Sequence, residues 1–360
     1  MKNCLALMSA FLLTTTLLAQ KVDLDRYSFS VSYRSLPSVE IDTSFHTFQF
    51  DWDAGPLMKL STMKDRPEEA LEIEGWRRLT TGAHITVQLR MEDIIIMKSD
   101  VSQREETLKD KNGNVTGKRN WYAPLLTYTY AARVLVKDHK GVQLQQYQAV
   151  SRETQHTYKG TEYPSRSAAA NILLNMMTVT TTLSRDVLYD NIQRLTNSLS
   201  RQYGYGELNV TDQVWILDSR KHPEYEKFRA NWAIIKNALF RLNPNEPVDD
   251  VKEEVKPAVA YFEKVRKRYN SSSKSDRKLR YASHYLLAKM YYYLDEPDLA
   301  VKEATDLVLN DYDSKDGRYL ESAAFNLKQL LNMNKRKTRH FPLDITSFQG
   351  PRADLLYSVQ

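Results

Sequence analysis

The residues of this chain that could bind a metal ion or transfer a proton are scattered along the sequence. Its seven histidines, at positions 46, 84, 139, 156, 222, 284 and 340, never fall within four residues of one another, so no local pair of metal ligands is present. No Gly-rich phosphate loop, HExxH or G-x-S-x-G sequence occurs. The chain has 45 Asp and Glu residues, so chance carboxylate pairs are plentiful and none can be assigned to acid and base catalysis. We therefore expect a protein that is not an enzyme, with no catalytic residue, no cofactor and no metal site.

One acidic segment, Asp311 to Gly317, has some features of a calcium-binding loop. Such a loop needs oxygen ligands at alternate positions and a bidentate Glu at the twelfth position. Here Lys315 takes the fifth position and Ser322 the twelfth. We therefore expect a capped loop between two helices, with Asp316 or Gly317 at the start of the second helix.

Two basic clusters are candidates for binding an anionic partner. Their members are Lys264, Arg266, Lys267, Arg268, Lys274, Arg277, Lys278 and Arg280 in the first, and Lys335, Arg336, Lys337 and Arg339 in the second. Such clusters can contact anionic lipid, polysaccharide or an acidic protein surface. The alternative, which we favour, is a solvated helix surface beside a basic loop. Nucleic acid is not an expected partner, because no aromatic residues are interleaved with these charges as a stacking motif.

The first twenty residues have the pattern of a secretory signal peptide. A basic start precedes an apolar run from Leu5 to Leu18, and Ala19 offers a small residue for cleavage before Gln20. An uncleaved membrane anchor is disfavoured, because the apolar run is short and contains three consecutive threonines. Cys4 is the single cysteine and lies before that run, so the mature chain would contain none. We expect cleavage near Ala19 and Gln20, and a soluble periplasmic or secreted protein of the cell envelope.

Alternating apolar and polar residues predict β-strands in the first part of the mature chain. The segments with this period of two are Tyr27 to Tyr33, Phe48 to Trp52 and Ile85 to Met91. The polar stretch Ser102 to Asn120 is typical of a long exposed hairpin tip or loop. Apolar residues at helical spacing then follow from Ser167 to Leu199, and a short strand is predicted at Val214 to Leu217. We interpret residues 21–217 as a β-rich α+β domain with helices packed on its sheet.

After Pro223 the apolar residues recur at the spacing of helices. Phe228, Trp232, Ile235 and Leu239 share one helical face. Further helices are predicted at Val251 to Tyr269, Leu279 to Leu294, Asp298 to Asn310 and Gly317 to Met333. The predicted fold class is therefore α+β, in which the β-rich N-terminal domain is followed by an all-α domain at residues 223–334. Residues 335–360 are predicted to form an extended or disordered tail.

Within the helical domain, Tyr281 to Tyr312 resembles one hairpin of the tetratricopeptide-repeat family. The residues at signature spacings are Leu287, Ala288, Tyr291 and Ala300. Ala288 and Ala300 can supply the small side chains needed where the two helices cross, and Pro297 fits the first turn of the second helix. The residues that depart from the signature are His284, Ala304, Leu307 and Tyr312, which stand where the family has Trp, a large apolar residue, Ala and Pro. The resemblance implies a helical-repeat domain. The chain is also similar in overall style to uncharacterised envelope proteins of the Bacteroidota.

The resemblance further implies where a partner would bind. In that family the exposed face of the first helix lines the binding groove, and Tyr285, Lys289 and Tyr292 match positions that contact a peptide there. The alternative is that Tyr292 and its neighbour Tyr293 pack on an adjacent helix or on the β-rich domain.

These observations predict a non-enzymatic interaction or scaffold protein that binds another envelope or outer-membrane protein through a helical-repeat groove. The alternative is a glycan- or lipid-binding module, in which Trp52, Trp76 and Trp121 of the β-rich domain stack on sugars. An enzyme whose residues converge only in three dimensions is a third reading, and a deep pocket with convergent acid and base groups would favour it. The sequence carries no signal for the oligomeric state.

Overall fold

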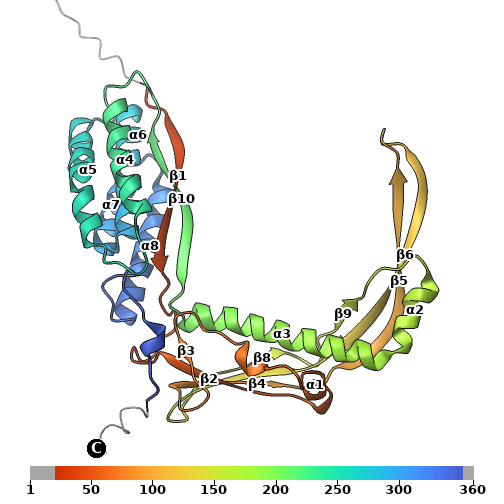
Figure 1. Ribbon diagram of the computed structural model, residues 1–360. Helices are drawn as coiled ribbons and strands as arrows, with labels where there is room; N and C mark the ends of the chain where they lie inside the picture. Colours follow the sequence, from red (N-terminus) through yellow and green to blue (C-terminus); the bar gives the residue numbers. More distant parts are fainter. Residues whose placement is uncertain (1–20, 352–360) are drawn as a thin grey trace, which may run out of the picture. The chain divides into compact units, whose positions relative to one another are not determined.

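The structure, a computed structural model, describes residues 21–351, which form two compact units (Figure 1). The helical unit contains the described residues up to Arg34 together with Glu207–Pro342, and the β-rich unit contains Ser35–Gly206 and the residues from Leu343 on. Strands lie mostly in the N-terminal half of the chain and helices in the C-terminal half, so the predicted mixture of α and β structure is confirmed. The predictions about the signal peptide and Cys4 lie outside the described residues.

The β-rich unit is built around a five-stranded sheet with the strand order β3-β2-β4-β7-β8. Its strands are β2 (Thr47–Asp53), β3 (Arg77–Arg78), β4 (Ile85–Met91), β7 (Ala132–Asp138) and β8 (Gln143–Val150). Strand β2 runs parallel to β3 and β4, and the other pairs are antiparallel. The alternation predicted for β2 and β4 is present, because Phe48, Phe50, Val87 and Leu89 are all buried.

The second sheet of this unit contains β5 (Ile95–Lys109), β6 (Val115–Thr129) and β9 (His156–Lys159). Strand β9 pairs only with Leu125–Tyr128 of β6, so most of β5 and β6 forms a two-stranded hairpin. Its tip contains Asn112 and Gly113, and Gly113 has a φ of 85°, a left-handed conformation that favours glycine. The polar stretch that predicted a hairpin tip or loop is therefore strand for most of its length.

The helices of the β-rich unit are α1 (Pro56–Ser61), the 3-10 turn η1 (Pro67–Glu69), α2 (Arg166–Leu174) and α3 (Met176–Tyr203). Ser165 caps α2, because its hydroxyl accepts a hydrogen bond from the backbone N–H of Ala168 at 3.2 Å. The apolar residues of α3 at helical spacing are buried, as predicted: Leu188, Ile192, Leu195 and Leu199. Buried Trp76 donates from Nε1 to the carbonyl of Tyr203 at 2.7 Å, which ties the loop before β3 to the end of α3.

The helical unit combines five helices with a two-stranded antiparallel ribbon (Figure 1). Its elements are β1 (Leu24–Arg34), β10 (Glu207–Leu217), α4 (Tyr225–Phe240), α5 (Asp249–Arg268), α6 (Lys274–Tyr293), α7 (Pro297–Leu309) and α8 (Ser314–Met333). One face of the ribbon packs on α4 and α6, where Phe29 contacts Trp232 and Tyr293 edge-on at ring-centroid distances of 5.8 and 5.6 Å. The bounds of α5, α7 and α8 lie within a few residues of those predicted from the apolar period, whereas α6 begins five residues earlier than predicted.

This grouping differs from the domain division predicted from the sequence. That division assigned the first and last strands of residues 21–217 to the N-terminal domain, whereas β1 and β10 pair with each other and pack on the C-terminal helices. The physical reason is that alternation identifies a strand with one buried face but does not identify what covers that face. The register joins Leu24 to Leu217 across almost two hundred residues, and no local pattern encodes that pairing.

The segment after α8 also differs from the predicted extended or disordered tail. Residues 335–351 contain no helix beyond the short 3-10 turn η2 (Ile345–Ser347), but Arg339 and His340 are only 3% and 2% exposed. Their side chains are held by the turn between α6 and α7, as described below. The remainder of the predicted tail, residues 352–360, lies outside the described residues.

Candidate functional site

Helix α6 carries the residues that the sequence analysis predicted to line a groove. Ser273 caps its start by accepting a hydrogen bond from the backbone N–H of Asp276 at 3.1 Å, which is why the helix begins five residues before the predicted Leu279. The face of α6 that would line a repeat groove contacts the chain's own strand β10. The predicted groove-lining face of α6 is therefore covered, at least at Lys289, by strand β10 of the ribbon.

Lys289 shows this coverage most clearly. It is only 7% exposed, and its Nζ donates to both carboxylate oxygens of Asp212 on β10, at 2.5 and 2.6 Å. The hydroxyl of Tyr293 donates to the same carboxylate at 2.7 Å. Burial, together with the neighbouring Asp212, raises the pKa of Tyr293, so its hydroxyl remains a donor. Lys289 thus joins the helix to the ribbon, where we had expected it to face a partner.

Tyr285 lies one turn before Lys289 and lines a pocket that the ribbon leaves open. The pocket has a volume of about 390 Å³ and is enclosed by both ribbon strands, α6 and α8. Its lining residues are Arg26, Thr211, Asp212, Gln213, Val214, Trp215, Tyr285 and Asp316, and we call it the ribbon pocket. Its volume lies near the lower end of the range of about 300–1,000 Å³ found for ligand pockets.

The polar groups of the ribbon pocket come from four different elements. Asp316 lies in the first turn of α8, where a negative charge is favoured by the helix dipole, and the Tyr281 hydroxyl donates a hydrogen bond to it. Burial, with Asp316 adding to the effect, raises the pKa of Tyr281 and keeps its hydroxyl protonated. The guanidinium of Arg26 lies 4.6 Å from the ring centroid of Trp215, its register partner across the ribbon. The site therefore offers a carboxylate, a guanidinium and two half-buried aromatic rings.

Tyr292, the third predicted site residue, is not part of this pocket. Its ring lies 4.9 Å from the guanidinium of Arg339, and its backbone carbonyl accepts a hydrogen bond from that guanidinium at 2.7 Å. Tyr292 therefore makes an internal packing contact, as the alternative interpretation held. Its contact is with the segment after α8 rather than with a neighbouring helix. Of the three predicted residues, only Tyr285 faces an open site.

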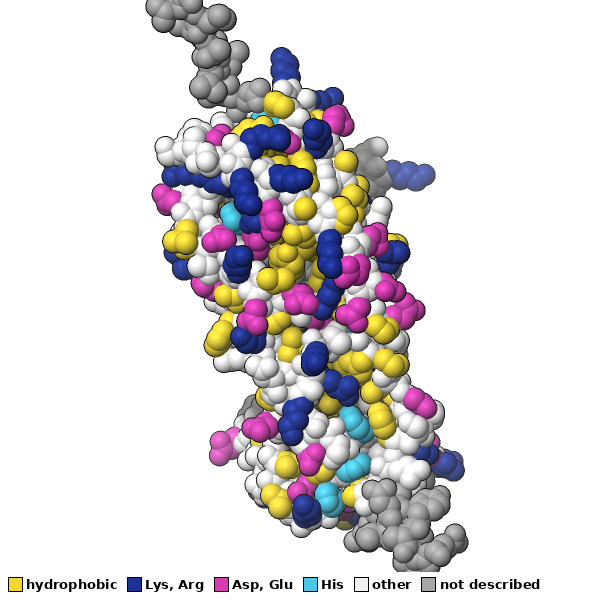
Figure 2. All heavy atoms as spheres, turned by 90° about the vertical axis from the view of Figure 1, so that its left-hand side faces the viewer, with side chains coloured by type: hydrophobic (Ala, Val, Ile, Leu, Met, Phe, Trp, Pro, Cys, Tyr) yellow, Lys and Arg dark blue, Asp and Glu magenta, His cyan; other side chains and the backbone are white. Residues whose placement is uncertain are grey.

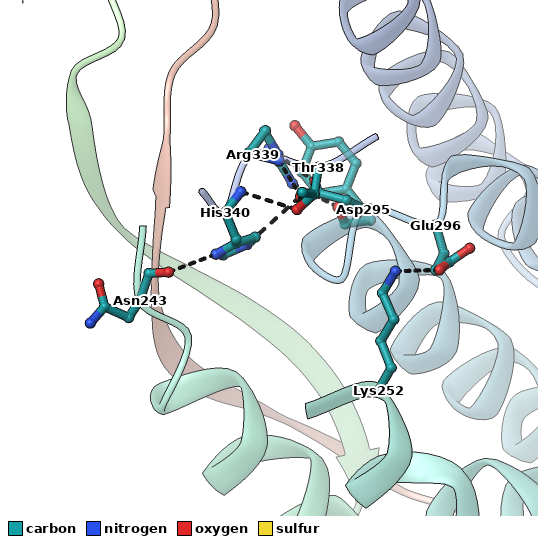
Figure 3. A network of polar contacts seen from close by, with 8 residues as sticks. Asn243, Lys252, Asp295, Glu296, Thr338, Arg339 and His340 are labelled. Carbon is teal, nitrogen blue, oxygen red and sulfur yellow. Dashed lines mark hydrogen bonds and ion pairs between the residues drawn. The ribbon is translucent and has the colours of Figure 1, made fainter. Parts of the chain in front are cut away.

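The contact of Tyr292 belongs to a buried polar network at the α6–α7 turn (Figure 3). Asp295 has a φ of 56° and directs its carboxylate toward residues 338–340. It accepts hydrogen bonds from Arg339 Nε at 2.6 Å, from the Arg339 backbone N–H at 2.6 Å and from the Thr338 hydroxyl at 2.8 Å. The Nδ1 of His340 lies 3.1 Å from the carbonyl of Asn243, and its Nε2 lies 3.8 Å from the carboxylate of Asp295. The network fixes the segment after α8 against the helices.

One cluster in the helical unit has the composition of a metal site. The ligand atoms of His284, Glu303 and Asp306 lie within 4.8 Å of one another. However, the guanidinium of Arg266 donates a hydrogen bond to Glu303 and lies 2.7 Å from the Nδ1 of His284, so it already supplies a cation there. Burial alone would raise the pKa of Glu303, but the hydrogen bond from His284 and the charge of Arg266 outweigh it and lower that pKa. We interpret the cluster as a buried ion pair with a packed histidine.

The opposite side of the helical array carries an apolar groove between α5 and the α6–α7 hairpin, with a volume of about 470 Å³. Its floor and rim are formed by Lys252, Glu253, Val255, Lys256, Val259, Ala260, Glu263, Tyr291, Leu294, Glu296 and Leu299. Figure 2 shows hydrophobic side chains gathered among acidic and basic ones on the face of the molecule that includes these helices. Mixed charges of this kind are typical of a solvated rim around partly exposed apolar side chains.

The basic clusters and the tryptophans are largely used in internal contacts. Several members of the clusters form ion pairs within the chain. These are Arg266 with Glu303, Arg268 with Glu224, Arg277 with Asp311, Lys278 with Asp23 and Arg339 with Asp295. Trp76 is buried, and Trp52 donates a hydrogen bond to Glu68. In the second sheet, Trp121 on β6 donates a hydrogen bond to Glu106 on the neighbouring strand β5. The three tryptophans thus do not form one exposed row.

The charged residues and the tryptophan of the ribbon pocket were not predicted as site residues from the sequence: Arg26, Asp212, Trp215 and Asp316. The first three meet only because β1 and β10 pair, and the fourth only because α8 packs beside α6. Asp316 or Gly317 was expected to start a helix, but α8 begins earlier, at Ser314, and is capped by Asp313, so Asp316 lies within its first turn.

No protein-family model matches this chain, and comparison with curated proteins found no similar sequence. Within residues 21–351, none of the helices has both the length and the apolar character that crossing a membrane requires.

Proposed function

We propose that this chain is a non-enzymatic scaffold protein of the cell envelope, and that its helical unit binds another protein at the ribbon pocket. The observation that carries the proposal is the position of Tyr285. In the tetratricopeptide-like interpretation its position corresponds to one that contacts a partner, and it lines the open ribbon pocket. The helix face around it is occupied by the ribbon.

The arrangement of the helices supports a tetratricopeptide-like interpretation of this unit. Helices α4 and α5 form one hairpin, α6 and α7 form a second, and α8 covers the end as a capping helix would. Ala288 is 1% exposed and packs with Ala304 and Leu307, so small residues lie at the contact between α6 and α7. Pro297 occupies the first turn of α7. The ribbon then takes the place that a bound segment takes in such an array.

The expected secretory signal supports an envelope location, and it makes another envelope or outer-membrane protein the natural partner. A partner segment that reaches the ribbon pocket contacts aromatic rings from both the ribbon and α6. Tyr and Trp side chains supply large contact areas at low cost in conformational entropy, which is why they are frequent in protein interfaces.

The test fills the pocket with a large side chain at an exposed position, so that the buried core is unchanged. Thr211 is exposed and lines the pocket, so Thr211→Trp should fill it. Asn209 is exposed two residues earlier on β10 and does not line the pocket, so Asn209→Trp is the matched control. Tagged chains are purified from envelope fractions and the co-purifying proteins are quantified by mass spectrometry. We expect a partner that is retained by the wild type and by Asn209→Trp but is lost with Thr211→Trp. Identical sets of proteins for all three chains would contradict the proposal.

A second candidate function is contact of the β-rich unit with a lipid surface. It is favoured by the exposed apolar side chains of α1 and the turn that follows it, where Leu57, Leu60 and Met63 are 55%, 53% and 75% exposed. Leu174 and Met177, at the junction of α2 and α3, are 84% and 71% exposed. Flotation of the chain with anionic and zwitterionic vesicles tests this function, and a chain that stays at the bottom of the gradient with both would exclude it.

A further inference from the structure

We propose that the ribbon pocket recognises a basic side chain, a lysine or an arginine that the partner protein presents on an extended segment. This inference rests on the proposed function, because it names the chemistry of the partner at the same site. It is carried by the charges and rings that face the pocket from β1, β10, α6 and α8.

The first step concerns which carboxylate remains available. Two carboxylates line the pocket, but Asp212 is engaged by Lys289 at 2.5 and 2.6 Å. Asp316 accepts a hydrogen bond from the Tyr281 hydroxyl, and no lysine or arginine among the described residues pairs with it within 4.0 Å. A carboxylate that accepts one neutral hydrogen bond retains acceptor positions and its full charge. Asp316 is therefore the group that an incoming ammonium or guanidinium would engage.

The second step concerns the walls of the pocket. Tyr285 and Trp215 are half-buried and line it from α6 and β10. Both rings already have a cation nearby, since Lys289 Nζ lies 5.4 Å from the Tyr285 centroid and the Arg26 guanidinium 4.6 Å from that of Trp215. These distances are those of favourable cation–π contacts. A long basic side chain can lay its aliphatic part along such rings while its charged end reaches a carboxylate.

Arg26 is the one further charge that faces the pocket. It stacks on Trp215 and does not pair with Asp316, so the carboxylate and the guanidinium lie in the same pocket as separate charges. Arg26 then supplies N–H donors for a backbone carbonyl of the bound segment. This gives the segment a direction, with its basic side chain toward α8 and its main chain toward β1. The opposite reading, in which Arg26 binds an acidic side chain, is an outcome that the experiment below distinguishes.

The experiment follows the indole N–H resonance of Trp215 in the chain from residue 21, assigned with a Trp215→Phe variant. The probes are four capped tripeptides, Gly-Xaa-Gly, in which the central residue is arginine, lysine, norleucine or glutamate. We expect the arginine and lysine peptides to shift this resonance at concentrations at least tenfold lower than the norleucine and glutamate peptides do. Asp316→Asn should remove this preference, because the amide keeps the shape but loses the charge, whereas Asp190→Asn, an exposed carboxylate of α3, should retain it.

Equal responses to all four peptides, a preference for glutamate, or an unchanged preference in Asp316→Asn would each overturn the inference. The proposed function is judged separately. If Thr211→Trp still loses its partner while the peptides show no charge preference, protein binding at the ribbon pocket stands and its assignment to a basic side chain fails. If Thr211→Trp keeps every partner, the proposed function fails whatever the peptides show.

Discussion

Replacing Asp295 by alanine should strongly destabilise the helical unit, because it leaves the guanidinium of Arg339 buried without its anion. The two side chains are 0% and 3% exposed, and the carboxylate accepts two hydrogen bonds of 2.6 Å from Arg339 (Figure 3). Burial disfavours a charged Arg339, but Asp295 outweighs burial and raises its pKa, so the guanidinium stays charged in the folded protein. Breaking a buried ion pair of this kind costs about 3–5 kcal/mol.

The backbone of Asp295 adds to this cost. Its φ of 56° is in the left-handed region, which Asp and Asn tolerate better than alanine does, and the substitution adds about 1 kcal/mol. A total of about 5 kcal/mol is a large share of the stability of a typical domain, which is about 5–15 kcal/mol. With a urea dependence of about 2 kcal/mol per M, the unfolding midpoint should fall by roughly 2.5 M.

Urea unfolding followed by far-ultraviolet circular dichroism measures this effect. Asp295→Asn separates the two contributions, since asparagine tolerates the left-handed backbone and removes only the charge. The double variant Asp295→Asn with Arg339→Met should recover much of the loss, because replacing both members of a buried pair by uncharged groups is often nearly neutral. If Asp295→Ala unfolds within about 0.5 kcal/mol of the wild type, the value expected for an ordinary surface substitution, the network has been misread.

Three further predictions concern other contacts. Lys289→Ala should cost about 3 kcal/mol in unfolding free energy, because it leaves the carboxylate of Asp212 without its cation, and a melt indistinguishable from wild type would show that the residue faces solvent after all. Gly75→Ala should be destabilising by more than about 1 kcal/mol, since Gly75 has a φ of 76° and an added Cβ would lie 2.6 Å from Tyr205 Cβ; an unchanged midpoint would refute it. Burial lowers the pKa of His340 below its ordinary 6.5, so the unfolded chain binds the proton more readily and stability should fall as the pH drops below about 6.5. His340→Gln should flatten that dependence in thermal melts between pH 7 and pH 5, and an unaltered slope would count against it.

Much of the helical architecture could be predicted from the sequence because it depends on local signals. The apolar period placed α5, α7 and α8 within a few residues of their observed bounds, and Pro297 marked the start of α7. The start of α6 was placed too late, because the residues before Leu279 are polar and are helical through the cap at Ser273 rather than through an apolar face.

The site was less predictable, because it depends on pairing between distant segments. The alternation of β1 predicts a half-buried strand in any context, and nothing local indicates that it pairs with β10 and packs on α4. The prediction that Lys289 faces a partner assumed that this face of α6 is open, whereas Lys289 pairs with Asp212 on β10. Arg339 was predicted to belong to a basic surface cluster. Its partner Asp295 lies 44 residues earlier in the sequence, and a local sequence window cannot show that the two side chains meet.

Photo-crosslinking in the source cells tests the central claim most directly. A photoreactive amino acid is placed at Tyr319, which is 68% exposed on α8 and close enough to Tyr285 to contribute to its raised pKa, mainly caused by burial. The matched control position is Phe325, which is 54% exposed on a different side of the same helix. We predict one discrete protein adduct from position 319 that is absent from position 325 and is lost when Thr211→Trp fills the pocket. An adduct of equal yield at both positions, or one that survives Thr211→Trp, would contradict binding at the ribbon pocket.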